Sequence, residues 1–381
     1  MPTATHATKT ARTKEATAPA MSSRERWLAA LDGQPVDRLP FWPKLDGAYA
    51  RAQRAPFRNM STDELHEFIG SDRPGWIPSG FRQTRRCTTY SCEERDGERL
   101  EVFGTPAGEL RRRSRFEPIS HSWHPVEMPV SSREDVLVMT EWYADASAEP
   151  DPEKVERARA SQAEAEASGR DATTANLGIT PLMDWVEHLA GVENGHLLLY
   201  DHPEEVGALF AAMRRLLLRQ VEIAAERCPA DLFYLIENTS TSLISPEQFR
   251  EHCLPLMQEC AGMVRARGKR LGLHMCGLLK AILPDLARSG AHAFEAFTSP
   301  TVGNTRLADG RAACPDVCLI GGTNAALWTR PATTIIAELE RDLAALPHHR
   351  RLVVTSGGVM PPLCPPETIR EVAEWVRRYE S

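Results

Sequence analysis

The sequence has little of what marks several large classes of protein. Its nine cysteines in 381 residues are odd in number and sparse, which excludes a disulfide-stapled scaffold. Its apolar runs are short, such as residues 197–199, and none approaches the about 20 residues of a transmembrane helix. Basic residues number 45 against 52 acidic ones, a net charge of −7, so no overall positive field would attract nucleic acid. We expect a small molecule or another protein as the partner, and neither nucleic acid nor a membrane.

The amino-terminal residues also lack a recognisable targeting signal. Residues 1–20 are rich in threonine and alanine and contain no apolar stretch of the kind that secretory signals need. We therefore expect a disordered tail over residues 1–21, a cytoplasmic location and free thiols. The rest of the chain, residues 22–381, has the ordinary balance of 42% hydrophobic and 25% charged residues. It is expected to form one domain.

The first half of this domain has irregular patterning. Ser22 and Ser23 are N-cap residues for a helix over residues 24–31, which Gly33 would end. Apolar residues between turn signals over residues 84–130 predict one or two antiparallel hairpins inserted into the fold. Residues 144–174 contain almost no large apolar side chain, which indicates a solvated helix and linker.

The second half alternates regularly between apolar strands and helices. The predicted strands are residues 232–236, 271–276, 293–297, 317–320 and 352–355, each followed by a helical pattern. Such alternation predicts a parallel sheet covered on both faces. A doubly wound sheet and an eightfold barrel both accommodate these units. Weaker strand candidates at residues 39–42, 76–78 and 175–179 bring the count to about eight, and no Gly-x-Gly-x-x-Gly follows the first strand. We therefore predict a TIM (β/α)8 barrel with an amino-terminal helix and the inserted hairpins.

The strongest local signal for chemistry is a histidine and a cysteine two residues apart. Side chains alternate along a strand, so His274 and Cys276 are expected on the same face, at the carboxyl end, where Gly277 permits a sharp turn. An imidazole and a thiolate together suit Zn²⁺. The alternative is that Cys276 only packs and that His274 is satisfied by a backbone carbonyl. A bare His-x-Cys does not decide between the two.

Other candidates for the site lie at neighbouring strand ends. Glu295 lies inside an apolar strand, where an acid is costly unless it is paired, hydrogen-bonded or ligating. Glu237 follows the strand of residues 232–236, and it could instead cap the next helix. Cys364 follows the last strand and could reach the barrel mouth or simply precede a helix. These three residues are candidates for a third metal ligand, and Glu295 and Glu237 are also candidates for acid–base catalysis.

Several motifs in order resemble the uroporphyrinogen decarboxylase superfamily. They are residues 24–31, 35–40, 104–108, 243–247, 274–277 and 321–323, so the resemblance spans about residues 22–381. It implies a TIM barrel. True decarboxylases of the family carry an Arg-Gln-Ala-Gly-Arg-Tyr segment after the first strand, and residues 43–49 here lack both arginines.

The His-x-Cys-Gly pattern is instead similar to the zinc-dependent corrinoid and coenzyme M methyltransferase branch. That branch implies Zn²⁺ held by His274, Cys276 and a later cysteine, which would fall near residues 356–358, where this sequence has none. Cys364, Glu237 or Glu295 would have to replace it. The resemblance implies transfer of a methyl or small alkyl group to or from a thiol. The chain has no Asp-x-His-x-x-Gly segment, so a corrinoid would come on a partner protein.

Two other hypotheses remain open at this point. The first is a lyase or decarboxylase acting on a small carboxylated substrate, with Asp46, Tyr49 and the arginines at positions 85–86 and 111–113 as candidates. The second is a barrel that binds a corrinoid or a partner protein without catalysis. Zinc content and turnover with methylcobalamin and thiols would distinguish these from the methyltransferase.

Overall fold

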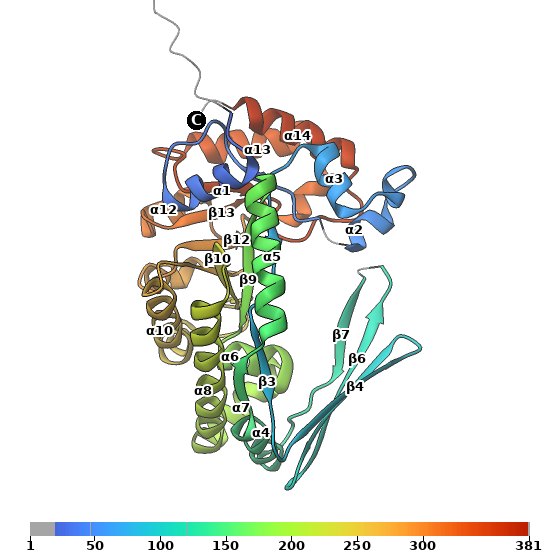
Figure 1. Cartoon of the computed structure of the whole chain (residues 1–381), viewed down its shortest axis with the longest axis vertical. Coiled ribbons are helices and arrows are strands. Elements are labelled where there is room, and N and C mark those ends of the chain that lie inside the picture. Colours follow the sequence, from blue (N-terminus) through green and yellow to red (C-terminus); the bar gives the residue numbers. More distant parts are fainter. Residues whose placement is uncertain (1–19, 46, 120, 380–381) are drawn as a thin grey trace, which may run out of the picture.

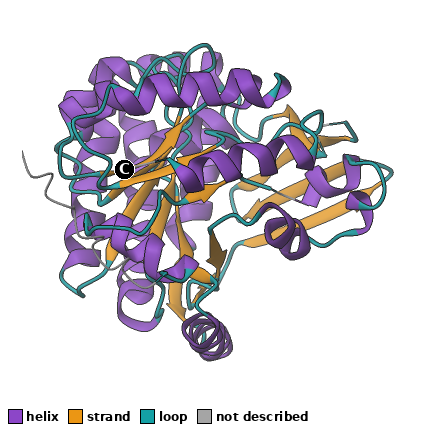
Figure 2. Ribbon diagram, turned by 90° about the horizontal axis from the view of Figure 1, so that it is seen from above, coloured by secondary structure: helices purple, strands orange, loops and turns teal. Residues whose placement is uncertain are grey.

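The centre of the structure is a parallel sheet that curls into a barrel. The computed structural model describes residues 20–45, 47–119 and 121–379. The sheet has eight strands in the order β1-β14-β13-β12-β11-β10-β9-β2. A backbone hydrogen bond of 2.8 Å from Asp72 N, just before β2, to Phe41 O in β1 links the two outer strands. The barrel is nearly closed and surrounded by helices, which confirms the predicted TIM barrel (Figure 1, Figure 2).

The strands of the barrel are short and follow one another along the chain with helices between most of them. They are β1 (Phe41–Trp42), β2 (Arg73–Trp76), β9 (Asp171–Gly178), β10 (Leu232–Ile236), β11 (Arg270–His274), β12 (Ala293–Phe297), β13 (Cys318–Gly322) and β14 (Leu352–Thr355). The main helices are α1 (Ser23–Asp32), α2 (Gly47–Ala52), α3 (Thr62–Ile69), α4 (Arg133–Asp145), α5 (Pro152–Ser168), α7 (Val192–Asp201), α8 (Pro203–Arg227), α10 (Leu254–Arg265), α12 (Leu307–Ala313), α13 (Ala332–Ala344) and α14 (Pro366–Arg378). Shorter turns are η1 (Phe57–Asn59), α6 (Pro181–Asp184), η2 (Trp185–Leu189), α9 (Pro246–Gln248), η3 (Phe249–Cys253), η4 (Lys280–Ile282), α11 (Leu283–Leu286) and η5 (Ala325–Thr329).

The interior of the barrel is a small apolar core, and α1 closes it at the amino-terminal ends of the strands. Alternate strand residues face inward, among them Trp42 and Tyr234, and they pack with Trp27 of α1. This helix forms because Ser22 and Glu25 make a reciprocal capping box and Gly33 ends it at φ 71°. Hydrogen bonds join α1 to residues beside the first residues of β9 and β14, so it covers the amino-terminal end of the barrel. The opposite, carboxyl-terminal end remains for a site.

The outward-facing strand residues pack against the surrounding helices. Leu271, Leu273 and Met275 belong to this larger outer core, whereas Gly272 lies against Tyr234 in the interior. The predicted alternation is confirmed within β11, but this strand ends at His274, so Cys276 lies beyond it and not on it as expected. Because His274 is the last residue of β11, its inward-facing side chain lies at the carboxyl end of the barrel.

A separate antiparallel sheet projects from the barrel, as Figure 1 shows. It consists of β4 (Thr89–Arg95), β5 (Glu98–Thr105), β6 (Gly108–Glu117) and β7 (Ser122–Glu127), within the segment expected to form hairpins. Trp142 of α4 packs edge-on against Phe103 at its base, with ring centroids 5.1 Å apart. The arginines of β6 pair with glutamates of the same sheet: Arg112 with Glu101 and Arg113 with Glu98.

Some segments differ from the sequence-based expectation. Residues 144–174 form β8 (Ser147–Pro150), which pairs with β3 (Phe81–Thr84), then α5 and the start of β9. Helix α5 buries Val155 and Ala158, so only one side of it is solvated. The helical pattern expected after the strand of residues 271–276 is reduced to η4 and α11, because Pro284 cannot donate a backbone hydrogen bond.

Two expectations concern residues outside the described ranges. Residues 1–19 of the expected disordered tail and the catalytic candidate Asp46 belong to this part of the chain. Among the helices that the structure describes, none is long and apolar enough to cross a membrane.

Candidate active site at the strand ends

Three strand ends contribute to a buried line of charged side chains. His274 ends β11 and stands in register with Glu295 of β12. The imidazole Nδ1 of His274 contacts Glu295 Oε2. The other carboxylate oxygen, Oε1, lies 2.8 Å from Nζ of Lys44, which follows β1. The side chains of Lys44 and Glu295 are only 13% and 4% exposed, so this ion pair is largely withdrawn from water.

The charges in this line stabilise one another against the cost of burial. Burial opposes protonation of His274, but the Glu295 carboxylate and the Cys276 side chain outweigh it and raise the pKa of His274 to about 9. Burial would raise the pKa of Glu295, but Lys44 and His274 hold it well below its ordinary value. An ionised carboxylate only accepts hydrogen bonds, so Nδ1 of His274 is the donor. The second ring nitrogen, Nε2, is left to act on another group.

The thiol of Cys276 lies beside this histidine. Strand β11 ends at His274, and Cys276 follows in the loop, where its side chain is half-buried. Its sulfur is 3.7 Å from Oδ1 of Asn238, whose Nδ2 donates to Glu187 Oε2 at 2.9 Å. The other oxygen of Glu187 is buried and has no hydrogen-bond partner among the described residues. Burial raises the pKa of Glu187, which sits on the π-helical turn η2.

The backbone adopts the left-handed conformation at two residues of this site. Asn238 has φ 45° and Ala296 has φ 59°, which is uncommon outside glycine. The Ala296 conformation coincides with a register shift between Glu295 and Phe297 in the pairing of β12 with β13. Such a bulge re-aims the side chains around it and persists only where the surrounding structure enforces it.

The remaining sequence candidates are held by other groups. Glu237 accepts hydrogen bonds from Thr180, from the backbone N at 2.9 Å and from Oγ1 at 2.6 Å. Tyr49 donates its hydroxyl to the backbone oxygen of Cys364. The thiol of Cys364 is buried, with its sulfur 3.8 Å from the Pro365 carbonyl oxygen, and burial raises its pKa to about 12. Both Tyr49 and Cys364 belong to the core outside the barrel wall.

The side chains of His274 and Cys276 at the barrel mouth are of the types that bind zinc. An imidazole oriented by a carboxylate is a common arrangement for a metal-ligating histidine. A half-buried thiol next to it adds a sulfur donor. Within the described ranges, no three side chains of His, Cys, Asp or Glu are placed to share one ion. Asn238 contacts both Cys276 and Glu187, and the Glu187 carboxylate oxygen without a partner among the described residues is a further oxygen donor close to the site.

Sequence reasoning missed Lys44, Asn238 and Glu187. The position of Lys44 just after the first strand could have revealed it, since residues at carboxyl strand ends form barrel sites. Asn238 immediately follows a candidate, Glu237, and the same rule applies to it. Glu187 lies in a π-helical turn, and no helical or strand periodicity points to it.

Glu237 makes the stability of the protein depend on pH. Burial raises its pKa to about 7, above the model-peptide value of 4.5, so the folded state holds a proton that the unfolded state loses. Its stabilising contribution is complete below pH 4.5 and is lost as the pH rises through about 7. We expect Glu237→Gln to reduce the loss of stability between pH 5 and pH 8 by about 2–3 kcal/mol.

Urea denaturation at the two pH values measures this difference. Glu156→Gln is the control, because the Glu156 side chain is 77% exposed on α5. The control should reproduce the wild-type change with pH. The same change with pH in Glu237→Gln as in wild type would contradict the prediction.

Polar side chains gathered at the carboxyl ends of parallel strands place this protein among TIM-barrel proteins with a site at the mouth. The sequence model of the family "Uroporphyrinogen decarboxylase (URO-D)" matches residues 187–379, and the chain belongs to this family. The superfamily indicated by the sequence motifs is thereby confirmed.

Two methyltransferases of Methanosarcina mazei are similar to this chain. The methylated-thiol–coenzyme M methyltransferase is 31% identical over 113 residues, which cover 30% of this chain and 30% of that protein's own length. A solved structure, a methyltransferase from the same organism, aligns with a TM-score of 0.57 at 16% identity over 93% of this chain and 98% of the other. At that identity, the structural likeness supports the fold.

Proposed function

We propose that this protein is a zinc-dependent methyltransferase that moves a methyl or small alkyl group to or from a thiol. The observation that carries the proposal is the placement of His274 at the end of β11, with Cys276 two residues later and Glu295 orienting the imidazole. The names of the two similar proteins support the reaction class. A corrinoid protein is the proposed methyl carrier.

Each residue of the site has a part in this proposal. Zinc held by His274 and Cys276 would supply the Lewis acidity that lowers the pKa of a substrate thiol. Glu295 accepts the hydrogen bond from Nδ1, so Nε2 of His274 is the atom that would hold zinc, with release of its proton. Lys44 balances the charge of Glu295 and keeps that carboxylate in place. We propose Glu187 as the third protein donor, because both oxygens of Glu295 are already engaged; Glu187 would have to move toward His274 and Cys276 for the three to share one ion.

A decarboxylase-like lyase has less support. It would depend on Asp46 and Tyr49, and the Tyr49 hydroxyl donates to a backbone oxygen in the core outside the barrel. The arginines of β6 are paired with glutamates of their own sheet. Arg112 and Arg113 are thus already engaged within their own sheet.

Metal analysis of Cys276→Ser tests the proposal. We expect wild type to bind about one zinc per chain under reducing conditions. Cys276→Ser should lower zinc affinity by more than the about 10–100-fold that loss of an outer-shell partner costs, because a ligand itself is removed. Its thermal melt without metal should match wild type, since sulfur and oxygen differ little in volume. Zinc affinity is measured by competition with a chelator.

Cys92→Ser is the matched control, because Cys92 is an exposed thiol on β4, away from the barrel. It should bind zinc as wild type does. Loaded wild type should then transfer methyl groups from methylcobalamin to members of a thiol panel. A wild-type chain that binds no zinc under metal-replete, reducing conditions would rule out the proposed function, and so would unchanged affinity in Cys276→Ser.

A further inference from the structure

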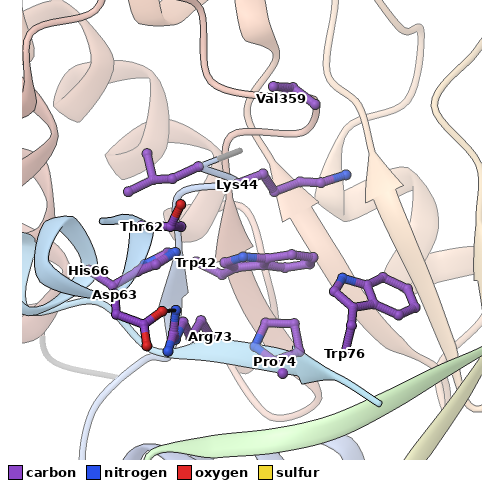
Figure 3. A pocket seen from close by; sticks show the side chains of 11 residues that line it. Trp42, Lys44, Thr62, Asp63, His66, Arg73, Pro74, Trp76 and Val359 are labelled. Carbon is purple, nitrogen blue, oxygen red and sulfur yellow. Dashed lines mark hydrogen bonds and ion pairs between the residues drawn. The ribbon is translucent and has the colours of Figure 1, made fainter. Parts of the chain in front are cut away.

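A cavity lies where the barrel is not closed by strand pairing, between β1 and β2. Its volume is about 400 Å³, and we call it the seam cavity. The side chains that line it include Trp42, Lys44, Trp76 and Val359, with polar residues at the end near α3. Figure 3 shows the two indoles side by side, with Val359 above them and the Lys44 side chain between Val359 and the indoles. A volume of this size accommodates a small organic molecule.

The walls of the seam cavity are aromatic and partly open to water. Trp76 is 56% exposed and Val359 is 50% exposed, although both side chains are apolar. The ring of Trp76 is backed by Tyr234 of the barrel interior, with centroids 5.7 Å apart and planes at 45°. Trp42 is buried and is itself backed by Trp27. The two indoles are thus held by packing, and Trp76 still exposes apolar surface that a ligand would remove from water.

The polar side chains at the α3 end of the cavity satisfy one another. Arg73 pairs with Asp63 at 2.6 Å and with Asp171 at 3.0 Å. His66 bonds Ser71 Oγ through Nδ1 at 2.7 Å. These groups have partners already, so they offer little to a ligand. Recognition in the seam cavity therefore depends on shape and apolar contact rather than on charge at this end.

The other end of the cavity leads to the proposed reaction centre. Lys44 lines the cavity and pairs with Glu295, which in turn orients His274. A ligand lying along the indoles would therefore place the group at its Lys44 end toward His274 and Cys276. The geometry connects an apolar, flat binding surface with the candidate site.

We propose that the small-molecule substrate of this protein is aromatic and that its ring docks against Trp42 and Trp76 in the seam cavity. Its alkyl-bearing end points toward Lys44. That this end carries the transferred group rests on the proposed function. Binding of the aromatic ring in the seam cavity is independent of it. A planar ring fits because indole faces stack on other rings in offset or edge-on arrangements.

Calorimetric titration of the metal-free full-length protein tests the assignment. The probes are 4-(methylthio)phenol and its saturated analogue 4-(methylthio)cyclohexanol, which share the polar groups and differ in planarity. We expect wild type to bind the aromatic probe about 10-fold more tightly. Trp76→Ala should lose about that factor, whereas Trp76→Phe should retain most of it. Tyr200→Ala is the control, because Tyr200 is 85% exposed on α7, outside the cavity, and it should bind as wild type does.

The outcomes distinguish this proposal from the proposed function. Equal affinity for both probes, no measurable binding at millimolar concentration, or unchanged binding in Trp76→Ala would each overturn the aromatic assignment. In the last case Trp76 would be a surface for a protein partner. Because the titration uses no metal, absence of zinc binding would leave its result intact. Conversely, zinc binding and methyl transfer without preference for the aromatic probe would refute only the seam-cavity assignment.

Discussion

Replacing Lys44 by methionine lowers the free energy of unfolding by about 3–5 kcal/mol. Lys44 Nζ lies 2.8 Å from Glu295 Oε1, and both side chains are largely buried. Methionine keeps most of the length and the apolar stem of lysine but removes the charge. The carboxylate of Glu295 then stays buried with His274 as its remaining charged partner. The expected loss is large because one of the two cations that compensate this buried carboxylate is removed, and methionine offers Glu295 Oε1 no hydrogen bond in its place.

The double variant Lys44→Met/Glu295→Gln separates charge from packing. Removing both charges should recover most of the stability, since the cost in the single variant comes from the carboxylate left behind. Urea denaturation at pH 7 of wild type, both single variants and the double variant gives the coupling free energy. A loss below about 1 kcal/mol in Lys44→Met would mean that the pair behaves as a solvated surface ion pair.

The fold was predictable where strands are largely apolar and buried on both faces. The expected strands at residues 232–236 and 293–297 agree with β10 and β12, because their residues are buried on both faces of a parallel sheet. Strand β2 was placed only near residues 76–78, whereas it spans Arg73–Trp76. Pro74 and Gly75 weaken its strand signal, and its pairing with β9 depends on residues almost 100 positions away.

The candidate site was predictable only in part, for a geometric reason. Alternation and strand order suffice to bring His274 and Glu295 together, since neighbouring parallel strands end side by side. The same alternation places Glu237 on the outer face, because Tyr234 faces inward three residues earlier, and its carboxylate meets Thr180 there. Lys44 and Glu187 come from a loop and a π-helical turn. Their positions depend on tertiary packing that no local pattern encodes.

Removing the indole of Trp27 lowers the free energy of unfolding by about 3–5 kcal/mol in Trp27→Ala. Trp27 is completely buried on α1 and packs edge-on against Trp42, with ring centroids 5.7 Å apart. Its Nε1 has no hydrogen-bond partner among the described residues, so the indole contributes through packing. Alanine leaves a void at the closed end of the barrel, and short strands around it cannot collapse far without losing their pairing.

Trp76→Ala is the matched comparison, because the same side chain is removed from a position that is 56% exposed. We expect it to cost less than about 1 kcal/mol in urea denaturation, and Trp27→Phe to fall between the two alanine variants. Equal costs for Trp27→Ala and Trp76→Ala would contradict the role of α1 as the floor of the barrel. Because Trp27 supports Trp42, which lines the seam cavity, Trp27→Ala should also weaken binding of the aromatic probe. The floor of the barrel and the proposed ring-binding surface are therefore energetically coupled through one aromatic contact.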